Sequence, residues 1–217
     1  MPATCLATSR CATAEKQVAV SGHETAETAP EVWLIRHGET EWSLSGQHTG
    51  VTDLPLTAAG EEKARAMAPL LAHAAFDRVL SSPLQRARRT AELAGLADVE
   101  SCDDLVEWRY GDYEGITTVD IREQRPDWSV WTDGAPHGES PGDVSARVDR
   151  VIELCQSLGG RSLLVAHGHV LRSLAARWVE QPIALGAHLP LGTARVCVLG
   201  YDRGTPTIDR WNGAAQT

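Results

Sequence analysis

Short apolar runs alternate along the chain with longer amphipathic segments, and this alternation is typical of α/β domains. We expect buried strands at residues 32–35, 76–81 and 163–166. Residues 99–105 are a candidate for a further short strand. Residues 194–201 and 207–211 are expected to form a closing antiparallel pair around Arg203 and Gly204. The pattern therefore predicts a single α/β domain.

Apolar positions at helical spacing occupy several of the segments between these runs. We expect helices at residues 58–74, 142–158 and 170–179, and another that begins at residues 82–83. Thr57 is the expected N-cap of the first helix, and Pro69 should kink this helix or end its first part. Ser82 is the expected N-cap of the helix that carries Arg86, with Pro83 in its first turn.

Other segments are expected to be irregular. Residues 41–57 are rich in hydroxyl, amide and imidazole groups, which favours a loop that contacts a ligand, although a plain surface turn is the alternative. Residues 107–115 combine aromatic residues, carboxylates and glycines, and are predicted to form a structured loop. Further on, Trp128 and Trp131 either form a lid or wall over a pocket or pack in the core.

The domain is expected to span residues 31–217. Residues 1–30 show no sustained periodicity and are interpreted as a disordered extension. No apolar run reaches the roughly 18 residues of a membrane helix, and the N-terminus lacks the apolar stretch of a secretory signal. The five cysteines are scattered without a Cys-x-x-Cys pair, which favours reduced thiols in a cytoplasmic protein over a disulfide or zinc framework.

The net charge of −9 argues against nonspecific nucleic-acid binding, which requires a basic face. We therefore expect neither nucleic-acid nor membrane partners. Attraction for an anionic ligand would have to come from a few local arginines and histidines within an acidic surface. The sequence leaves the oligomeric state open, and a homodimer is compatible with it.

Candidate chemistry is concentrated where the predicted strands end. The first strand ends in Arg36-His37 and the third in His167, and a glycine follows each histidine. Ligands of open α/β sheets bind beyond the carboxyl ends of the strands, so we expect the two imidazoles to meet in one pocket. Arg86 lies one turn into a helix that begins at another strand end. Of the three arginines in that helix, Arg86 is the one that we expect to point toward the strand ends.

Two arginines and two histidines around one point suit a tetrahedral dianion. One imidazole can attack phosphorus while the other groups neutralise charge on the equatorial oxygens. A carboxylic acid such as Glu107, from the loop at residues 107–115, can protonate the leaving oxygen. The sequence has no metal-ligand spacing, no Gly-x-Ser-x-Gly elbow and no Walker loop. Metal hydrolases, serine hydrolases and nucleotide-binding enzymes are therefore poorly supported.

Six motifs follow one another along the chain, LIRHGETEW, TDLPLT, SSPLQRARRTAE, EWRYGDYEG, GES and VAHGHVLR. In this order they resemble the histidine phosphatase superfamily, the phosphoglycerate-mutase-like proteins, over about residues 32–178. The resemblance implies a three-layer α/β/α sandwich with a mostly parallel sheet. It also implies a reaction that needs no metal or other cofactor.

The same resemblance implies roles for single residues. His37 would be the nucleophile that becomes phosphohistidine, and Glu107 would be the proton donor. The phosphate pocket would be completed by Arg36, Arg86 and His167. Candidates for substrate contact are Ser43, Thr49, Gly50, Tyr110 and His169.

Mutases and phosphatases share this fold, and the sequence favours hydrolysis. Cofactor-dependent mutases carry a long insertion with extra basic residues after the acidic loop, whereas the segment that follows Glu107 here is short and net acidic. Ser43 and His169 stand where the mutases have Asn. The sequence most resembles a phosphatase branch that includes sedoheptulose-bisphosphatase-like enzymes and broad-specificity acid phosphatases from actinobacteria. We therefore expect a phosphomonoesterase for small phosphorylated metabolites such as sugar phosphates or bisphosphates. The alternatives are a phosphoglycerate mutase and a silent member that binds phosphorylated ligands.

Overall fold

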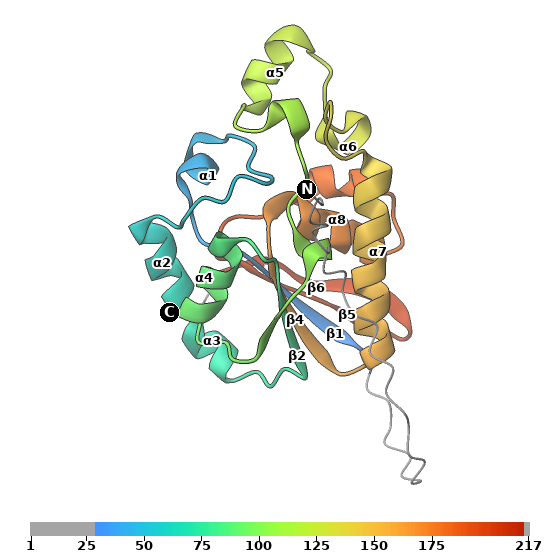
Figure 1. The fold of residues 1–217 in the computed structure, drawn as a ribbon. Coiled ribbons are helices and arrows are strands. Elements are labelled where there is room, and N and C mark those ends of the chain that lie inside the picture. The colour runs from blue at the N-terminus through green and yellow to red at the C-terminus, as the bar shows by residue number, and fades with distance from the viewer. Residues whose placement is uncertain (1–28, 215–217) are drawn as a thin grey trace, which may run out of the picture.

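The computed structural model describes residues 29–214. The expected disordered extension at residues 1–30 lies almost wholly outside this range and stays a prediction. A six-stranded sheet with the order β3-β2-β4-β1-β5-β6 forms the centre of the molecule (Figure 1). Its strands are β1 (Glu31–Arg36), β2 (Arg78–Ser81), β3 (Val99–Ser101), β4 (Arg161–Ala166), β5 (Val196–Asp202) and β6 (Thr205–Gly213). The first four strands in this order run parallel, and β5 and β6 add an antiparallel edge, so the sheet is mostly parallel as expected.

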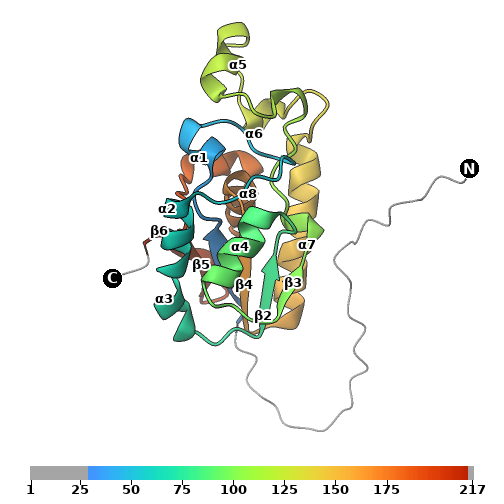
Figure 2. The same ribbon diagram turned by 60° about the vertical axis from the view of Figure 1, so that its left-hand side comes forward.

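Helices cover both faces of this sheet (Figures 1 and 2). One face carries α2 (Ala58–Arg65), α3 (Ala68–Ala72) and α4 (Gln85–Leu93), and the other carries α7 (Pro141–Leu158) and α8 (Gly168–Trp178). Successive residues of β4 divide between two cores. Leu163 and Val165 join the core under α2–α4, whereas Leu164 and Ala166 join the core under α7 and α8. Because strand side chains alternate between faces, this division confirms the three-layer sandwich.

Smaller elements surround the edge of the sheet at which the parallel strands end. Three short helices lie there, α1 (Glu41–Ser45), α5 (Thr118–Gln124) and α6 (Val130–Asp133) (Figures 1 and 2). Short 3₁₀ helices occur at η1 (Asp103–Leu105), η2 (Gly111–Tyr113) and η3 (Ile183–His188). Within residues 29–214, no helix combines the length and the apolar character that crossing a membrane requires.

Two loop and strand predictions were wrong in detail. Residues 41–57 are not loop throughout, because the side chains and backbone of Thr40 and Ser43 form a capping box that starts α1, and Gly46 ends the helix with a φ of 81°. The strand expected at residues 99–105 stops at Ser101. Beyond it, Cys102 N–H reaches the carbonyl of Ser81, the last residue of β2, so β3 has no further strand to pair with and η1 follows.

The predicted cap of α4 was also wrong. The helix begins at Gln85, with Leu84 at the cap position and no side-chain bond from it. Asp53, from the preceding long loop, accepts the Gln85 N–H at 2.8 Å through its carboxylate. A residue distant in sequence therefore caps the first residue of α4, whereas the Ser82 hydroxyl accepts the Leu84 N–H at 3.4 Å and also makes the contact described below. The expected helix at residues 58–74 is divided into α2 and α3, with Pro69 in the first turn of α3.

Candidate active site

The register of the sheet brings three side chains to one edge. The last residues of β1 and β4 are paired, and the last residue of β2 pairs one position before the end of β4. The next residues of these strands, His37, His167 and Ser82, therefore leave the sheet close together. The ring centroids of His37 and His167 lie 5.1 Å apart. The two imidazoles thus meet, as the strand ends suggested.

His37 is held as one tautomer. Its Nδ1 lies 2.6 Å from the carbonyl oxygen of Gly38. Since a carbonyl can only accept, Nδ1 carries the hydrogen, and Nε2 of the neutral ring keeps its lone pair. Burial lowers the pKa of His37 well below its usual value, and the charges of Arg36 and Arg86 lower it further. The ring is therefore neutral near pH 7, and Nε2 has the electronic state of a nucleophile.

His167 is fixed from both sides of its ring. Arg86 Nε donates to its Nδ1 at 3.0 Å, and its Nε2 lies 2.8 Å from Ser82 Oγ. An arginine N–H can only donate, so Nδ1 is the acceptor and Nε2 carries the hydrogen toward the hydroxyl. Burial and then the charge of Arg86 hold the pKa of His167 well below its usual value. His167 is therefore a neutral imidazole of defined orientation.

Arg86 is fully buried and is held by backbone carbonyls of the 41–57 segment. Its Nη1 donates to Thr52 at 2.8 Å, and its Nη2 donates to Thr49 at 3.1 Å and to Gly50 at 3.0 Å. The carboxylate of Glu114 holds this segment from the opposite direction by accepting the Gly50 and Thr52 N–H groups, each at 2.9 Å. The segment thus orients Arg86, which in turn orients His167.

Arg36 brings a positive charge, with one unpaired N–H group, to the same edge of the sheet. Its Nη1 donates to the Leu191 carbonyl at 2.5 Å. Its Nε is the one buried side-chain polar atom in residues 29–214 that has no hydrogen-bond partner. Gly168 allows the guanidinium to lie against the start of α8, since a Cβ there would be only 3.3 Å from Arg36 Cζ. A buried N–H without an acceptor is costly, and an oxyanion at this edge would satisfy it.

Glu107 lies at the N-terminus of α8 and is almost buried. Its Oε2 accepts the N–H of His169, and its Oε1 accepts the N–H groups of Val170 and Trp108, all at 2.9 Å. The carboxylate thereby takes up N–H groups that the first turn of a helix leaves unpaired. Three backbone N–H groups therefore fix the Glu107 carboxylate next to His169.

A wall of aromatic and imidazole rings continues from Glu107. Tyr110 Oη lies 2.7 Å from His169 Nδ1, and burial raises the pKa of this phenol well above its usual value, so Tyr110 stays protonated. The ring centroid of Trp131 lies 5.1 Å from that of His169, and the centroid of Trp128 lies 5.5 Å from that of His48. Both tryptophans belong to the larger core and are almost buried. Of the two alternatives, packing in the core is therefore the one that the structure supports.

The other candidates for substrate contact have structural bonds in this arrangement. Ser43 Oγ accepts the Thr40 N–H and donates to the Thr40 carbonyl. Thr49 and Gly50 face Arg86 with their carbonyls, as described above. In the described part of the chain, no three His, Cys, Asp or Glu side chains are grouped so that they could hold a metal ion.

Sequence reasoning missed two groups that join these parts. Ser82 was assigned to a helix cap, although its place directly after a strand would have marked it as a site residue. Thr90 gave no local signal. Its hydroxyl accepts the Gly38 N–H at 2.9 Å and donates to the Arg86 carbonyl at 2.7 Å. Thr90 therefore links the turn after His37 to the helix that carries Arg86.

Comparisons with known proteins agree with this geometry. Residues 32–214 match the histidine phosphatase superfamily, branch 1. The chain is 43% identical to an acid phosphatase of Mycobacterium tuberculosis over 79% of this chain and 86% of that protein. It is 38% identical to sedoheptulose 1,7-bisphosphatase of Saccharomyces cerevisiae over 69% of this chain and 67% of that protein.

Solved structures give the same result. A Mycobacterium tuberculosis protein superposes with a TM-score of 0.83 at 39% identity and covers 86% of this chain and 99% of its own. A mycobacterial glucosyl-3-phosphoglycerate phosphatase superposes with a TM-score of 0.73 at 30% identity and covers 86% of this chain and 100% of its own. The extent of these matches, together with the paired strand-end histidines, shows that the chain belongs to the histidine phosphatase superfamily, branch 1.

Proposed function

We propose that the chain hydrolyses phosphate monoesters of small metabolites through a phosphohistidine on His37, without a metal ion. One observation carries this proposal. A neutral imidazole with its Nε2 lone pair available lies in the same cluster as the buried Arg86 and the partly buried Arg36, whose buried Nε–H has no partner. Such a cluster combines a nucleophile with fixed positive charge, which is what transfer of a phosphoryl dianion requires.

In the first half of the reaction, His37 Nε2 attacks phosphorus and the bond to the ester oxygen breaks. The N–P bond that forms leaves a positive charge on the ring, which the Nδ1–H bond to the Gly38 carbonyl spreads. The positive charges of Arg36 and Arg86 neutralise charge on the equatorial oxygens, and the neutral His167 ring helps to orient these oxygens through its Nε2–H. The protein needs little covalent chemistry beyond this, because phosphoryl transfer depends mainly on position and charge.

Glu107 is the group that we assign to the leaving oxygen. Its Oε1 already accepts two N–H groups, but its Oε2 accepts only the His169 N–H and keeps a lone pair for a proton. The protonated carboxyl donates this proton as the ester bond breaks. The resulting carboxylate then takes a proton from the water that attacks phosphohistidine, which returns Glu107 and His37 to their starting states.

The names of relatives support sugar phosphates or bisphosphates as the substrate class. One relative is named for a sugar bisphosphate and a solved neighbour for a phosphorylated glycoside. A relative that is 31% identical over 83% of this chain is named a probable phosphoglycerate mutase, so the mutase reaction is tested beside hydrolysis. The small metabolite is the only partner that this proposal requires.

The test is release of inorganic phosphate from sugar phosphates, sugar bisphosphates and 3-phosphoglycerate in EDTA. His37→Ala should abolish release, and His73→Ala should not alter it, because His73 lies exposed at the end of α3. Full activity of His37→Ala would contradict the proposal. If phosphate is not released and 3-phosphoglycerate isomerises when a bisphosphate primer is added, the chain is a mutase. Neither activity would favour a silent phospholigand-binding member.

A second test concerns the acid. Glu107→Gln should reduce the rate by a factor on the order of 10²–10⁴ for alkyl phosphates, whose leaving oxygen needs a proton, and by less for p-nitrophenyl phosphate. Equal losses on both substrates would argue against Glu107 as the proton donor.

A further inference from the structure

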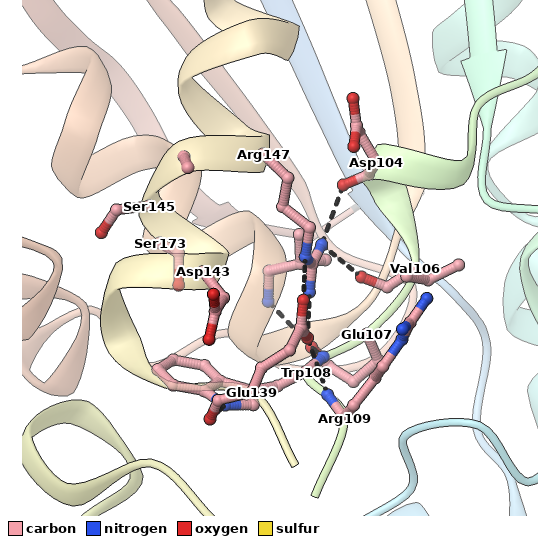
Figure 3. Close-up of polar contacts among 12 residues, drawn as sticks. Asp104, Val106, Glu107, Trp108, Arg109, Glu139, Asp143, Ser145, Arg147 and Ser173 are labelled. Atoms are coloured by element: carbon pink, nitrogen blue, oxygen red, sulfur yellow. Dashed lines mark hydrogen bonds and ion pairs between the residues drawn. The ribbon is translucent and has the colours of Figure 1, made fainter. Parts of the chain in front are cut away.

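Arg147, in the middle of α7, is a nearly buried cation outside the histidine cluster, and only 6% of its side chain is exposed. Its Nε and Nη2 donate to the two carboxylate oxygens of Glu139 at 2.8 and 3.0 Å. Its Nη1 donates to the carbonyls of Asp104 at 2.8 Å and Val106 at 2.7 Å (Figure 3). Every guanidinium nitrogen is therefore used, and the two carbonyls lie in the stretch that leads into Glu107.

Glu139 holds the same stretch on its other side. Its Oε2 accepts the Arg109 N–H at 2.9 Å, and its own N–H donates to the Arg109 carbonyl at 2.8 Å. Its carbonyl accepts the indole Nε1–H of Trp108 at 2.9 Å. Figure 3 shows the Arg147–Glu139 pair lying beside the loop, with the partners on either side of Glu107 in sequence. The pair thus fixes the backbone before and after Glu107.

The geometry points to a positioning function for this pair. We infer that Arg147 and Glu139 form a clamp that holds residues 104–109 so that the Glu107 carboxyl reaches the leaving oxygen. This inference rests on the proposed function, in which Glu107 is the acid. The amides of α8 fix the carboxylate itself, whereas the clamp fixes the main chain that carries it. Proton transfer demands hydrogen-bond distance, so a small displacement of this loop should affect that transfer most.

An ion pair is suited to this task because of its shape more than its strength. Breaking a buried pair leaves an unpaired charge, whereas an apolar replacement of both partners is often as stable, so such pairs are weak evidence for stability. The planar fork of Arg147 joins one carboxylate and two carbonyls at set directions, which a lysine ammonium cannot reproduce. A lysine in place of Arg147 keeps the positive charge but lacks the planar guanidinium, so it should not hold the loop in position.

The chain offers a matched control on the same helix and the same loop. Arg150 pairs with the Asp104 carboxylate through Nε at 3.0 Å and Nη2 at 2.5 Å. Its side chain is 57% exposed, and its bond to the loop ends at a side chain and not at the backbone. Arg150→Met therefore removes an ion pair to this loop without removing a hold on the main chain around Glu107.

The experiment compares Arg147→Met, Arg147→Lys, Glu139→Gln and Arg150→Met on an alkyl phosphate and on p-nitrophenyl phosphate. Both Arg147 variants should lose up to about 10²-fold in kcat on the alkyl phosphate. They should lose far less on p-nitrophenyl phosphate, whose leaving group needs no proton. Glu139→Gln should also lose more kcat on the alkyl phosphate than on p-nitrophenyl phosphate, and Arg150→Met should have the wild-type kcat on both substrates. Thermal melting monitors folding, and Arg147→Lys and Glu139→Gln serve if Arg147→Met does not fold.

A double variant separates positioning from general destabilisation. When Glu107→Gln is already present, adding Arg147→Lys should cause little further loss on the alkyl phosphate. A full additional loss, or equal losses on both substrates, would overturn the clamp. If Glu107→Gln alone shows no dependence on the leaving group, the proposed acid and the clamp both fail. If Glu107→Gln shows that dependence and the Arg147 variants do not, the clamp alone is refuted.

Discussion

Ser82→Ala is a one-atom change at the centre of the cluster. Ser82 is fully buried, and its Oγ accepts the hydrogen on His167 Nε2 at 2.8 Å. Because His167 is fully buried as well, water cannot replace the lost acceptor. A buried donor left without a partner costs about 1–3 kcal/mol. The free energy of unfolding should fall by this amount.

The rate should fall with it. Without Ser82, His167 retains only the Arg86 bond, and its ring is no longer fixed from both sides. If the loss of this bond raises the activation free energy by the same amount, about 1–3 kcal/mol, then kcat/KM decreases roughly 5- to 150-fold. Urea unfolding and steady-state kinetics with a sugar phosphate measure the two quantities.

Ser81→Ala is the matched control. Ser81 is equally buried one residue earlier, and its Oγ donates to the Ser82 carbonyl at 2.9 Å. This variant should lose some stability but keep kcat. The sequence alone had predicted that Ser82 caps α4, and a cap would affect stability only. Wild-type kcat/KM in Ser82→Ala, with or without lost stability, would show that the Ser82 hydroxyl does not orient His167 for the reaction.

Three further predictions follow from the same contacts. Glu114→Gln weakens the hold on the Gly50 and Thr52 amides, so Arg86 should be less well oriented and kcat/KM with a sugar phosphate should fall about tenfold; an unchanged value would contradict this. Burial lowers the folded-state pKa of His37, His167 and His169 well below 6.5. The unfolded chain therefore binds more protons below about pH 6.5, and urea titrations should show the free energy of unfolding falling as pH falls from about 6.5 through that range. Burial also raises the pKa of Cys197 to about 11, so its alkylation at pH 7.5 should be slow in the folded protein and fast in urea.

The sheet and the principal cluster could be predicted because they depend on local patterns. Apolar runs mark strands, and the His-Gly turns at two strand ends mark the edge at which ligands bind. Of the arginines in α4, the structure buries Arg86, whereas Arg88 is exposed and Arg89 pairs with Glu61 and Glu92. The distance from the strand end was therefore enough to select the inward side chain.

What the sequence did not reveal depends on contacts between distant segments. The carboxylate of Asp53 caps α4 across a loop, and no local propensity could show that it displaces Ser82 from this role. Likewise, Arg147 lies within an amphipathic helix pattern, and its inward position depends on Glu139 and the carbonyls of another loop. Tertiary contacts of this kind override the local preference of a cap or a helix face.

The most direct test of the central claim is to trap the covalent intermediate. The enzyme is mixed with a substrate labelled in its phosphoryl group and quenched in alkali within the first turnover, and the labelled peptide is identified. Label is expected on His37 in the wild type and in the His73→Ala control, and none is expected in His37→Ala. Phosphate release without label on His37, or label on another residue, would contradict the phosphohistidine mechanism.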